Sequence, residues 1–337
     1  MAQLKFTIVT GPTSLPQTEN ISSAGNIWYD PTTNRVKYSY AGTLAGWSAG
    51  GTLINGRSDF AGAGTQNAGL AIGGYNSYPN TVASCTEEYN GATWSAGGSL
   101  ISGRRSIAGA GTQNEGLAFG GMDSSFNSVS CTEEYNGATW STGGNLITAR
   151  QDVAAAGTQN AGLAFGGYNS YPNTAASCTE EYNGSSWSAG GSLISGRRTA
   201  AGAGTQNAGL AFGGTFGSPS FSQVSCTEEY NGTSWATGGA LNVPRAGFGG
   251  AGTQNEALAF GGYAPYPLQA GTCTEEYNGT SWSTANPLIN SRQNLAGTGT
   301  QSAGLAFGGT DPQTGVALSS TEEYIKGGDI VILVCCL

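Results

Sequence analysis

The sequence predicts an all-β protein built as a closed ring of six blades, each a four-stranded antiparallel sheet: a six-bladed β-propeller. The first observation is a Gly-Gly pair that recurs about every 47 residues, from Gly73-Gly74 to Gly308-Gly309. Each pair is followed by Glu-Glu-Tyr, and five of the six copies continue with a Trp and then an Arg. The second is that Gly fills 57 of 337 positions, and we find no stretch with the sustained apolar spacing of an amphipathic helix.

The register of the two chain ends predicts that the ring is closed. The last Glu-Glu-Tyr copy has no Trp after it, because the sequence ends soon after Tyr324. The missing Trp lies near the other end, where Trp47 in GWSAGGTLINGR matches Trp94 in TWSAGGSLISGR. A strand around Trp47 would complete the blade that contains Tyr324 and would leave no open sheet edge.

Each repeat is expected to contain four strands in a constant order. The first consists of very small residues, as in FAGAGT at 60–65, because only Gly and Ala allow six strands to converge near the axis. The second is GLAFGG, as at 116–121, and the third is CTEEY. An Asn-Gly pair such as Asn90-Gly91 then predicts a tight hairpin turn with two positive φ values. The fourth, outer strand carries the Trp, whose indole should fill space against the next blade.

The net charge of −9 comes largely from the repeat, because twelve of the 21 acidic residues form the six Glu-Glu pairs. Clustered excess positive charge, which nucleic acid binding would require, is absent. Each repeat places one Arg at an equivalent position, and two roles are open for this set: pairing with Glu inside or between blades, or binding an anionic ligand. The six are Arg57, Arg104, Arg150, Arg197, Arg245 and Arg292.

Cysteine and histidine usage limits the chemistry. Equivalent positions on neighbouring blades lie about 10 Å apart or more, whereas a disulfide needs Cα atoms within about 7 Å. We therefore expect the five repeat cysteines to be small buried thiols between blades: Cys85, Cys131, Cys178, Cys226 and Cys273. The sequence has no His, which excludes Ser-His-Asp and Cys-His catalysis and most zinc sites. We predict no catalytic residue, no metal and no cofactor.

The order of Arg, Gly-Gly, Tyr and Trp, repeated over residues 45 to about 325, resembles the Kelch family of β-propellers. The resemblance implies the fold and leaves the activity open, because that family includes adaptors, binding proteins and an oxidase. The copper chemistry of that oxidase depends on imidazole ligands, which this sequence lacks. Glycan-active enzyme chemistry is therefore supported by analogy of fold alone.

Ligand binding is expected where the repeats differ most, between the Gly-Gly pair and Cys-Thr-Glu-Glu. These loops join the second and third strands and lie on the same face as the Arg-bearing loops. Their aromatic side chains suit glycans or protein loops, since aromatic planes contact sugar or apolar surface at low entropic cost. Unconstrained drift is the alternative interpretation. The candidate ligand-binding residues are Tyr75, Tyr78, Phe126, Tyr168, Tyr171, Phe216, Phe221, Tyr263 and Tyr266.

The segments outside the repeats predict an attachment region. Residues 25–38, GNIWYDPTTNRVKY, predict a hairpin, and they resemble a short segment of tail-fibre and other virion appendage proteins of bacteriophages. The apolar run at 329–334 would aggregate if left exposed, so we expect it to be an added strand or a subunit contact. The expected organisation is an N-terminal arm at 1–44, the propeller at 45–325 and a C-terminal strand at 326–337.

Together these features predict a non-enzymatic bacteriophage virion protein, a tail fibre or appendage, that recognises the host surface or builds the particle. Its expected partners are other virion proteins, through the N-terminal arm and the C-terminal strand, a host surface glycan or protein, and further copies of itself. Nucleic acid binding and membrane insertion are not expected. No N-terminal stretch has the apolar core of a signal peptide, so synthesis in the host cytoplasm and location in the virion are expected. The alternatives are an intracellular Kelch-type scaffold for protein–protein interactions and a glycan-active enzyme on a propeller scaffold.

Overall fold

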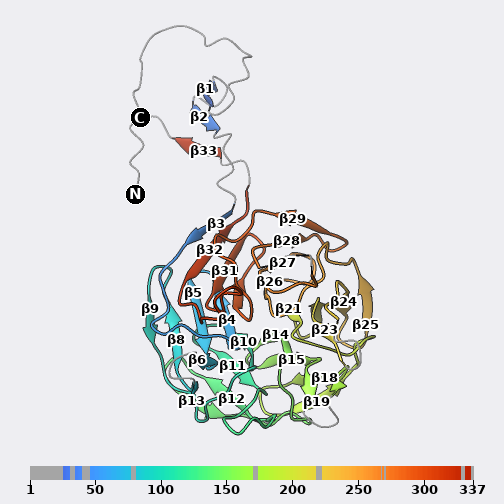
Figure 1. The fold of residues 1–337 in the computed structure, drawn as a ribbon. Coiled ribbons are helices and arrows are strands. Elements are labelled where there is room, and N and C mark those ends of the chain that lie inside the picture. Colours follow the sequence, from blue (N-terminus) through green and yellow to red (C-terminus); the bar gives the residue numbers. More distant parts are fainter. Residues whose placement is uncertain are drawn as a thin grey trace. The chain divides into compact units, whose positions relative to one another are not determined.

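The computed structural model describes residues 26–30, 35–39, 46–76, 81–169, 174–217, 222–266, 268, 271–327 and 331–334. The chain divides into two compact units. The larger is Ala45–Lys326, and the smaller combines Met1–Leu44 with Gly327–Leu337. The described residues form strands and turns without any helix, as the all-β prediction requires (Figure 1).

The larger unit is a propeller of six four-stranded antiparallel blades, as predicted. Figure 1 looks down the axis of the ring, with the chain passing from blade to blade in the order of the colours. From the innermost strand outward, blade 1 is β4 (Ala61–Thr65), β5 (Ala68–Ile72), β8 (Thr86–Tyr89) and β9 (Trp94–Ala96). Blade 2 is β10 (Ala108–Gly111), β11 (Gly116–Phe119), β12 (Thr132–Tyr135) and β13 (Trp140–Thr142). Blade 3 is β14 (Ala154–Thr158), β15 (Ala161–Phe165), β18 (Thr179–Tyr182) and β19 (Trp187–Gly190).

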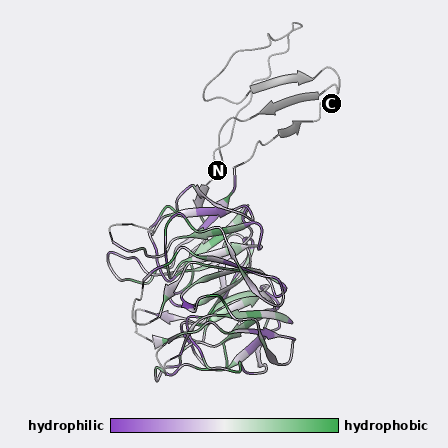
Figure 2. Ribbon diagram, turned by 90° about the vertical axis from the view of Figure 1, so that its right-hand side faces the viewer, coloured by the Kyte–Doolittle hydropathy of each residue, from purple (hydrophilic) through white to green (hydrophobic). Residues whose placement is uncertain are grey.

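The second half of the ring has the same plan. Blade 4 is β21 (Ala201–Thr205), β22 (Ala208–Phe212), β24 (Thr227–Tyr230) and β25 (Trp235–Gly238). Blade 5 is β26 (Gly249–Gly252), β27 (Ala257–Phe260), β28 (Thr274–Tyr277) and β29 (Trp282–Ala285). Blade 6 is β30 (Ala296–Gly299), β31 (Ala303–Phe307), β32 (Thr321–Ile325) and β3 (Gly46–Ala49). In the side view of Figure 2, hydrophobic segments lie within the strands of the blades.

Blade 6 closes the ring in the way the register predicted. Strand β3 pairs antiparallel with β32, and Trp47 lies opposite Tyr324. The indole of Trp47 packs on Phe260 of blade 5, with ring centroids 4.8 Å apart. The innermost strands β30 and β4 also contact each other across the seam. The first and last propeller strands therefore belong to one sheet.

The innermost strands are made of Gly and Ala because they approach each other closely. A Cβ added at Gly202 would lie 2.2 Å from the carbonyl oxygen of Ala155 on the preceding blade. One added at Gly250 would lie 2.9 Å from the Cβ of Ala201. Larger side chains on this side of the strands would push the blades apart, which confirms the sequence interpretation.

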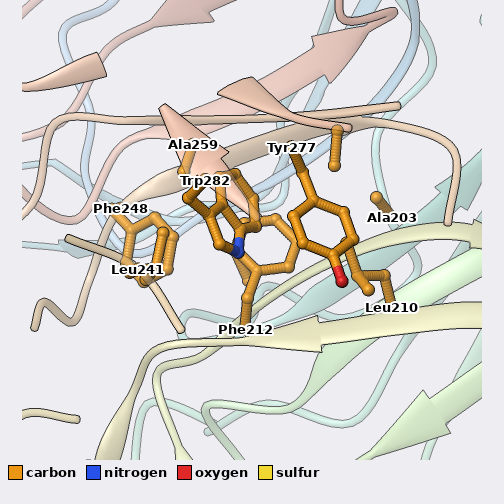
Figure 3. Packing of buried hydrophobic residues seen from close by; sticks show 10 residues of the cluster. Ala203, Leu210, Phe212, Leu241, Phe248, Ala259, Tyr277 and Trp282 are labelled. Carbon is orange, nitrogen blue, oxygen red and sulfur yellow. The ribbon is translucent and has the colours of Figure 1, made fainter. Parts of the chain in front are cut away.

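The core lies between adjacent blades and is repeated around the ring. Figure 3 shows Tyr277 and Trp282 of blade 5 packed beside Phe212 of blade 4. The Trp282 indole donates to Thr227 Oγ1 at 3.0 Å, and the Tyr277 hydroxyl donates to Glu229 Oε1 at 2.6 Å. Both acceptors belong to the preceding blade, whereas the Trp indole was expected to pack against the next one. The reason is that Tyr277 and Trp282 are cross-strand partners, so both rings lie on the sheet face that covers blade 4.

The Asn-Gly turns differ from the predicted two-residue hairpin. Strands β8 and β9 are joined by the four residues 90–93, and the positive φ belongs to Gly91 alone, at 86°. The side-chain oxygen of Asn90 accepts hydrogen bonds from the N–H groups of Ala92 and Thr93, at 3.0 and 2.9 Å. The Asn side chain therefore stabilises the loop by bonding to the backbone, without adopting the left-handed conformation.

The repeat cysteines form no disulfide, as predicted, but they are less buried than expected. All five are free thiols; Cys226 is exposed and the other four are half-buried. Each Cys directly precedes a buried Thr, such as Thr86 after Cys85. Because successive residues of an extended chain point to opposite sides, the Thr takes the buried side and the thiol does not.

The smaller unit contains a three-stranded antiparallel sheet in the order β1-β2-β33. Its strands are β1 (Asn26–Asp30), β2 (Arg35–Ser39) and β33 (Val331–Val334). The predicted hairpin is thus present as the β1–β2 pair, while its turn at 31–34 lies outside the described residues. Strand β33 pairs with β2, so the apolar C-terminal run is an added strand.

Candidate functional site

The six repeat arginines are structural ion pairs inside the blades. Arg150 is fully buried, and its Nη2 lies 2.7 Å from Glu180 Oε1. Its Nη1 donates to the carbonyl oxygens of Gly166 and Cys178, at 2.6 and 3.1 Å. The same pairing joins Arg57–Glu87, Arg104–Glu133, Arg197–Glu228, Arg245–Glu275 and Arg292–Glu322. Because all six guanidinium groups are buried and paired, none is exposed to a ligand.

The residues that lie two positions after these arginines are joined by a closed ring of six backbone hydrogen bonds. One residue from each inter-blade linker takes part, and its N–H donates to the carbonyl oxygen of the preceding member. The donor-to-acceptor pairs are Ser106 to Asp59 (2.6 Å), Asp152 to Ser106 (3.0 Å), Thr199 to Asp152 (3.1 Å), Gly247 to Thr199 (3.1 Å), Asn294 to Gly247 (2.6 Å) and Asp59 to Asn294 (3.1 Å). Since equivalent residues of all six linkers form it, this axial ring surrounds the propeller axis on the loop face.

The backbone of the axial ring is left-handed throughout. The φ values are 53° for Asp59, 49° for Ser106, 53° for Asp152, 51° for Thr199, 60° for Gly247 and 52° for Asn294. Left-handed φ costs a non-Gly residue roughly 1–2 kcal/mol, less for Asp and Asn. Five such residues at one place make a concentration of strain of the kind found at binding sites.

Two further arginines join this ring to the predicted aromatic residues. The residue directly after each repeat Arg forms an antiparallel β-bridge with the residue that follows the Gly-Gly pair of the same repeat. Arg105 holds its guanidinium carbon 4.9 Å from the ring centroid of Tyr75 and 5.3 Å from that of Phe126. Arg198 lies 4.6 Å from the ring centroid of Tyr168. The structure therefore brings three predicted aromatic residues beside two half-buried cations.

The carboxyl groups of the axial ring belong to Asp59 and Asp152. Burial raises the pKa of Asp59, and so does the negative charge of Asp152. A hydrogen bond from the Ser58 hydroxyl and the positive charge of Arg105 lower this pKa. Burial likewise raises the pKa of Asp152, opposed by a hydrogen bond from Ser106 and by the charges of Arg198 and Arg105. Two acidic and two basic side chains thus interact at the centre of the loop face. We call Asp59, Asp152, Arg105 and Arg198 the axial site.

The remaining predicted aromatic residues occupy different settings. Phe126 is 70% exposed at a loop tip with φ of 66°, and Tyr266 is 99% exposed. Phe216 is half-buried in β23 (Thr215–Phe216), which pairs with β20 (Arg197–Arg198). Tyr263 borders the axial ring, because a Cβ added at Gly247 would lie 2.7 Å from its ring. Tyr78, Tyr171 and Phe221 lie outside the described residues.

A pocket of about 270 Å³ lies on the loop face between blades 5 and 6. It is lined by Tyr263 and Leu268 from one loop, Pro312 from the next, and Gln293 from the linker between them. Gln293 directly precedes Asn294 of the axial ring, so the pocket adjoins the ring on its uncharged side. It contains no carboxylate and no guanidinium among its lining residues.

The axial site was not singled out from the sequence, although a signal for it exists. The two positions after each repeat Arg read Ser-Asp, Arg-Ser, Gln-Asp, Arg-Thr, Ala-Gly and Gln-Asn, directly after an Arg that is constant in all six repeats. A search for variable positions outside the loops between the second and third strands would have included them. What the pattern could not show is that linkers far apart in the sequence meet at the axis.

Among the described residues, no group of three or more His, Cys, Asp or Glu could hold a metal ion. No helix long and apolar enough to cross a membrane occurs in that part of the chain. In comparisons with known proteins, no family model matches the chain, and no curated protein does.

Proposed function

We propose that this protein is a non-enzymatic recognition module of a bacteriophage virion, a Kelch-like propeller that binds the host surface through its loop face. One observation carries the proposal: the side chains that vary between repeats gather on that face, while the repeated polar side chains are used inside the fold. Trp, Tyr, Arg and the Glu-Glu pair are all engaged within or between blades. The axial site and the loop aromatics belong to the positions that differ between repeats, and we propose that they contact the partner.

The composition of this face suits recognition of a large surface. Phe126 is well exposed, and Arg105 lies against both its ring and that of Tyr75. Aromatic and Arg side chains are the residues that contribute most to binding at interfaces.

The virion assignment is supported by the terminal unit. The segment that resembles phage appendage proteins forms the β1–β2 hairpin, and β33 from the other end of the chain joins it. A small sheet built from both termini is separate from the propeller as a compact unit. We propose that it attaches the propeller to other virion proteins, and the genes beside this one test the assignment directly: tail and capsid genes are expected there.

Adsorption to cells tests the recognition function. Fluorescently labelled protein is expected to bind intact cells of the host strain, and a Tyr75→Ala/Phe126→Ala/Tyr168→Ala variant is expected to lose most of that binding. The matched control is Thr93→Ala/Thr139→Ala/Thr280→Ala, three exposed positions on the Asn-Gly turns of the opposite face. Unfolding temperatures near that of the parent show that the variants are folded. Equal adsorption by the loop-face variant and the parent would refute the proposal.

A glycan-active enzyme is a second candidate because of the two carboxyl groups of Asp59 and Asp152. A general acid needs a raised pKa, and both pKa values are raised by burial. Glycoside hydrolysis commonly uses such a carboxyl pair. Release of reducing ends from host polysaccharide that Asp152→Asn abolishes would establish this candidate; binding without release supports the non-enzymatic one.

A further inference from the structure

We propose that the axial site binds a neutral sugar residue, with the carboxylates of Asp59 and Asp152 accepting hydrogen bonds from its hydroxyl groups and Arg105 and Arg198 donating hydrogen bonds to its oxygens. This inference rests on the proposed recognition function and gives that function a place and a ligand class. The place is the centre of the loop face, where all six linkers converge in the axial ring.

The balance of charges selects the ligand class. The site holds two carboxylates and two guanidinium groups, so its formal charges cancel. All four residues are half-buried. An anionic ligand would meet the two Asp residues and a cationic one the two Arg residues, so neither gains net attraction. A hydroxyl group can donate to a carboxylate and accept from a guanidinium at once, and a sugar presents several of them.

Unpaired polar atoms beside the axial ring fit the same ligand. Arg105 Nε, a donor, and Gln151 Oε1, an acceptor, have no hydrogen-bond partner. Arg105 directly precedes Ser106 of the ring, and Gln151 directly precedes Asp152. Buried polar groups are normally paired. Both atoms are covered in the free protein, so a hydroxyl-bearing ligand would satisfy the donor and the acceptor after the surrounding side chains shift.

Aromatic rings lie beside the charged centre on the side of blades 1 to 3. Tyr75 and Tyr168 each have an Arg against one ring face, and Phe126 is 70% exposed beside Arg105. The left-handed φ of 66° at Phe126 is unusual for a bulky residue, and the side chain of Asp123 holds this loop by accepting from the N–H groups of Ser125 and Asn127, at 2.8 and 2.9 Å. Aromatic surface next to polar groups matches a sugar, whose C–H face is apolar and whose edge is polar.

The side-chain Nε–H signal of Arg105 in NMR spectra of the full-length protein tests the inference. The signal is assigned by its loss in Arg105→Lys. The probes are the methyl glycosides of glucose, galactose, mannose and N-acetylglucosamine, with galacturonate as the charged comparator. At least one neutral glycoside is expected to shift the signal saturably, and galacturonate is expected to bind more weakly.

The Asp59→Asn/Asp152→Asn variant gives the sharper result, because it removes both negative charges and leaves both guanidinium groups. Asn suits this backbone, since Asn294 adopts φ of 52° at the equivalent position. Affinity for the neutral glycoside is expected to fall about tenfold as charge-assisted hydrogen bonds are lost, and galacturonate should become the better ligand. Asp311→Asn, on the same face but outside the axial site, should change neither affinity. If the double variant does not fold, Arg105→Lys replaces it, read on the Arg198 signal, with weaker neutral-sugar binding expected.

The inference is overturned if no neutral glycoside moves the Arg105 signal, if galacturonate is the better ligand of the parent, or if the Asn variant keeps its preference. Cell adsorption separates this outcome from failure of the proposed function. If no neutral glycoside binds but the parent adsorbs to host cells, recognition stands and the axial site is refuted. If the parent binds a neutral glycoside without adsorbing to cells, the axial site stands and host recognition fails.

Discussion

Replacing Trp140 with Ala should lower the free energy of unfolding by about 4–5 kcal/mol. Trp140 is 7% exposed, and its ring lies 4.9 Å from that of Tyr135. Emptying a large buried aromatic site costs about 3–5 kcal/mol. The indole N–H also donates to Thr86 Oγ1 and to the carbonyl oxygen of Gly98, both at 3.0 Å. The net worth of such bonds, about 1 kcal/mol each, places the loss in the upper part of the range.

Urea denaturation followed by intrinsic fluorescence and circular dichroism measures this loss. Trp140→Phe keeps an aromatic ring and loses the N–H donor, so a smaller loss of about 1–3 kcal/mol is expected. The matched control is Thr142→Ala, an exposed residue of the same outer strand, with a change below about 0.5 kcal/mol. Similar losses for Trp140→Ala and Thr142→Ala would refute the inter-blade role assigned to the repeated Trp.

Three further predictions concern the seam, the buried ion pairs and alkaline pH. Deleting residues 1–49 removes β3 and should abolish cooperative unfolding. Deleting residues 1–44 retains β3, so cooperative unfolding should persist. Equal melting of the two truncated proteins would contradict ring closure by this strand. Arg197→Met should lower the free energy of unfolding by about 3–5 kcal/mol, because it leaves Glu228 buried and unpaired. Arg198→Met, at the next residue, which is half-buried, should lower it by less than about 1 kcal/mol. Urea denaturation measures both losses. Burial and hydrogen bonds to Glu raise the pKa of Tyr89, Tyr182, Tyr230 and Tyr277 from 10.0 to about 12. Their contribution to stability is thus complete below pH 10 and is lost as the pH rises toward 12, where a late step in tyrosinate absorbance should coincide with unfolding. Absence of this late step would contradict the buried inter-blade bonds.

Most of the propeller followed from the sequence because its determinants are periodic or local. The spacing of the Gly-Gly pairs set the number of blades, and the unmatched Trp47 located the seam. Small residues in the innermost strands were interpretable because six strands can converge only where side chains are small. The errors were of finer geometry: the Asn90 side chain caps a longer turn, and Trp282 packs on the preceding blade.

The amino-acid sequence alone determined the blade number, the strand order and the face that carries the variable aromatic loops. Only the tertiary structure decided which residues meet at the centre of that face. Asp59 and Asp152 come from different linkers, and each is placed by backbone hydrogen bonds that pass from linker to linker around the whole axis. Arg105 contacts Tyr75 from one blade and Phe126 from another. Such a site depends on closing the ring, because the six linkers come together at one axis only when the last blade is joined to the first.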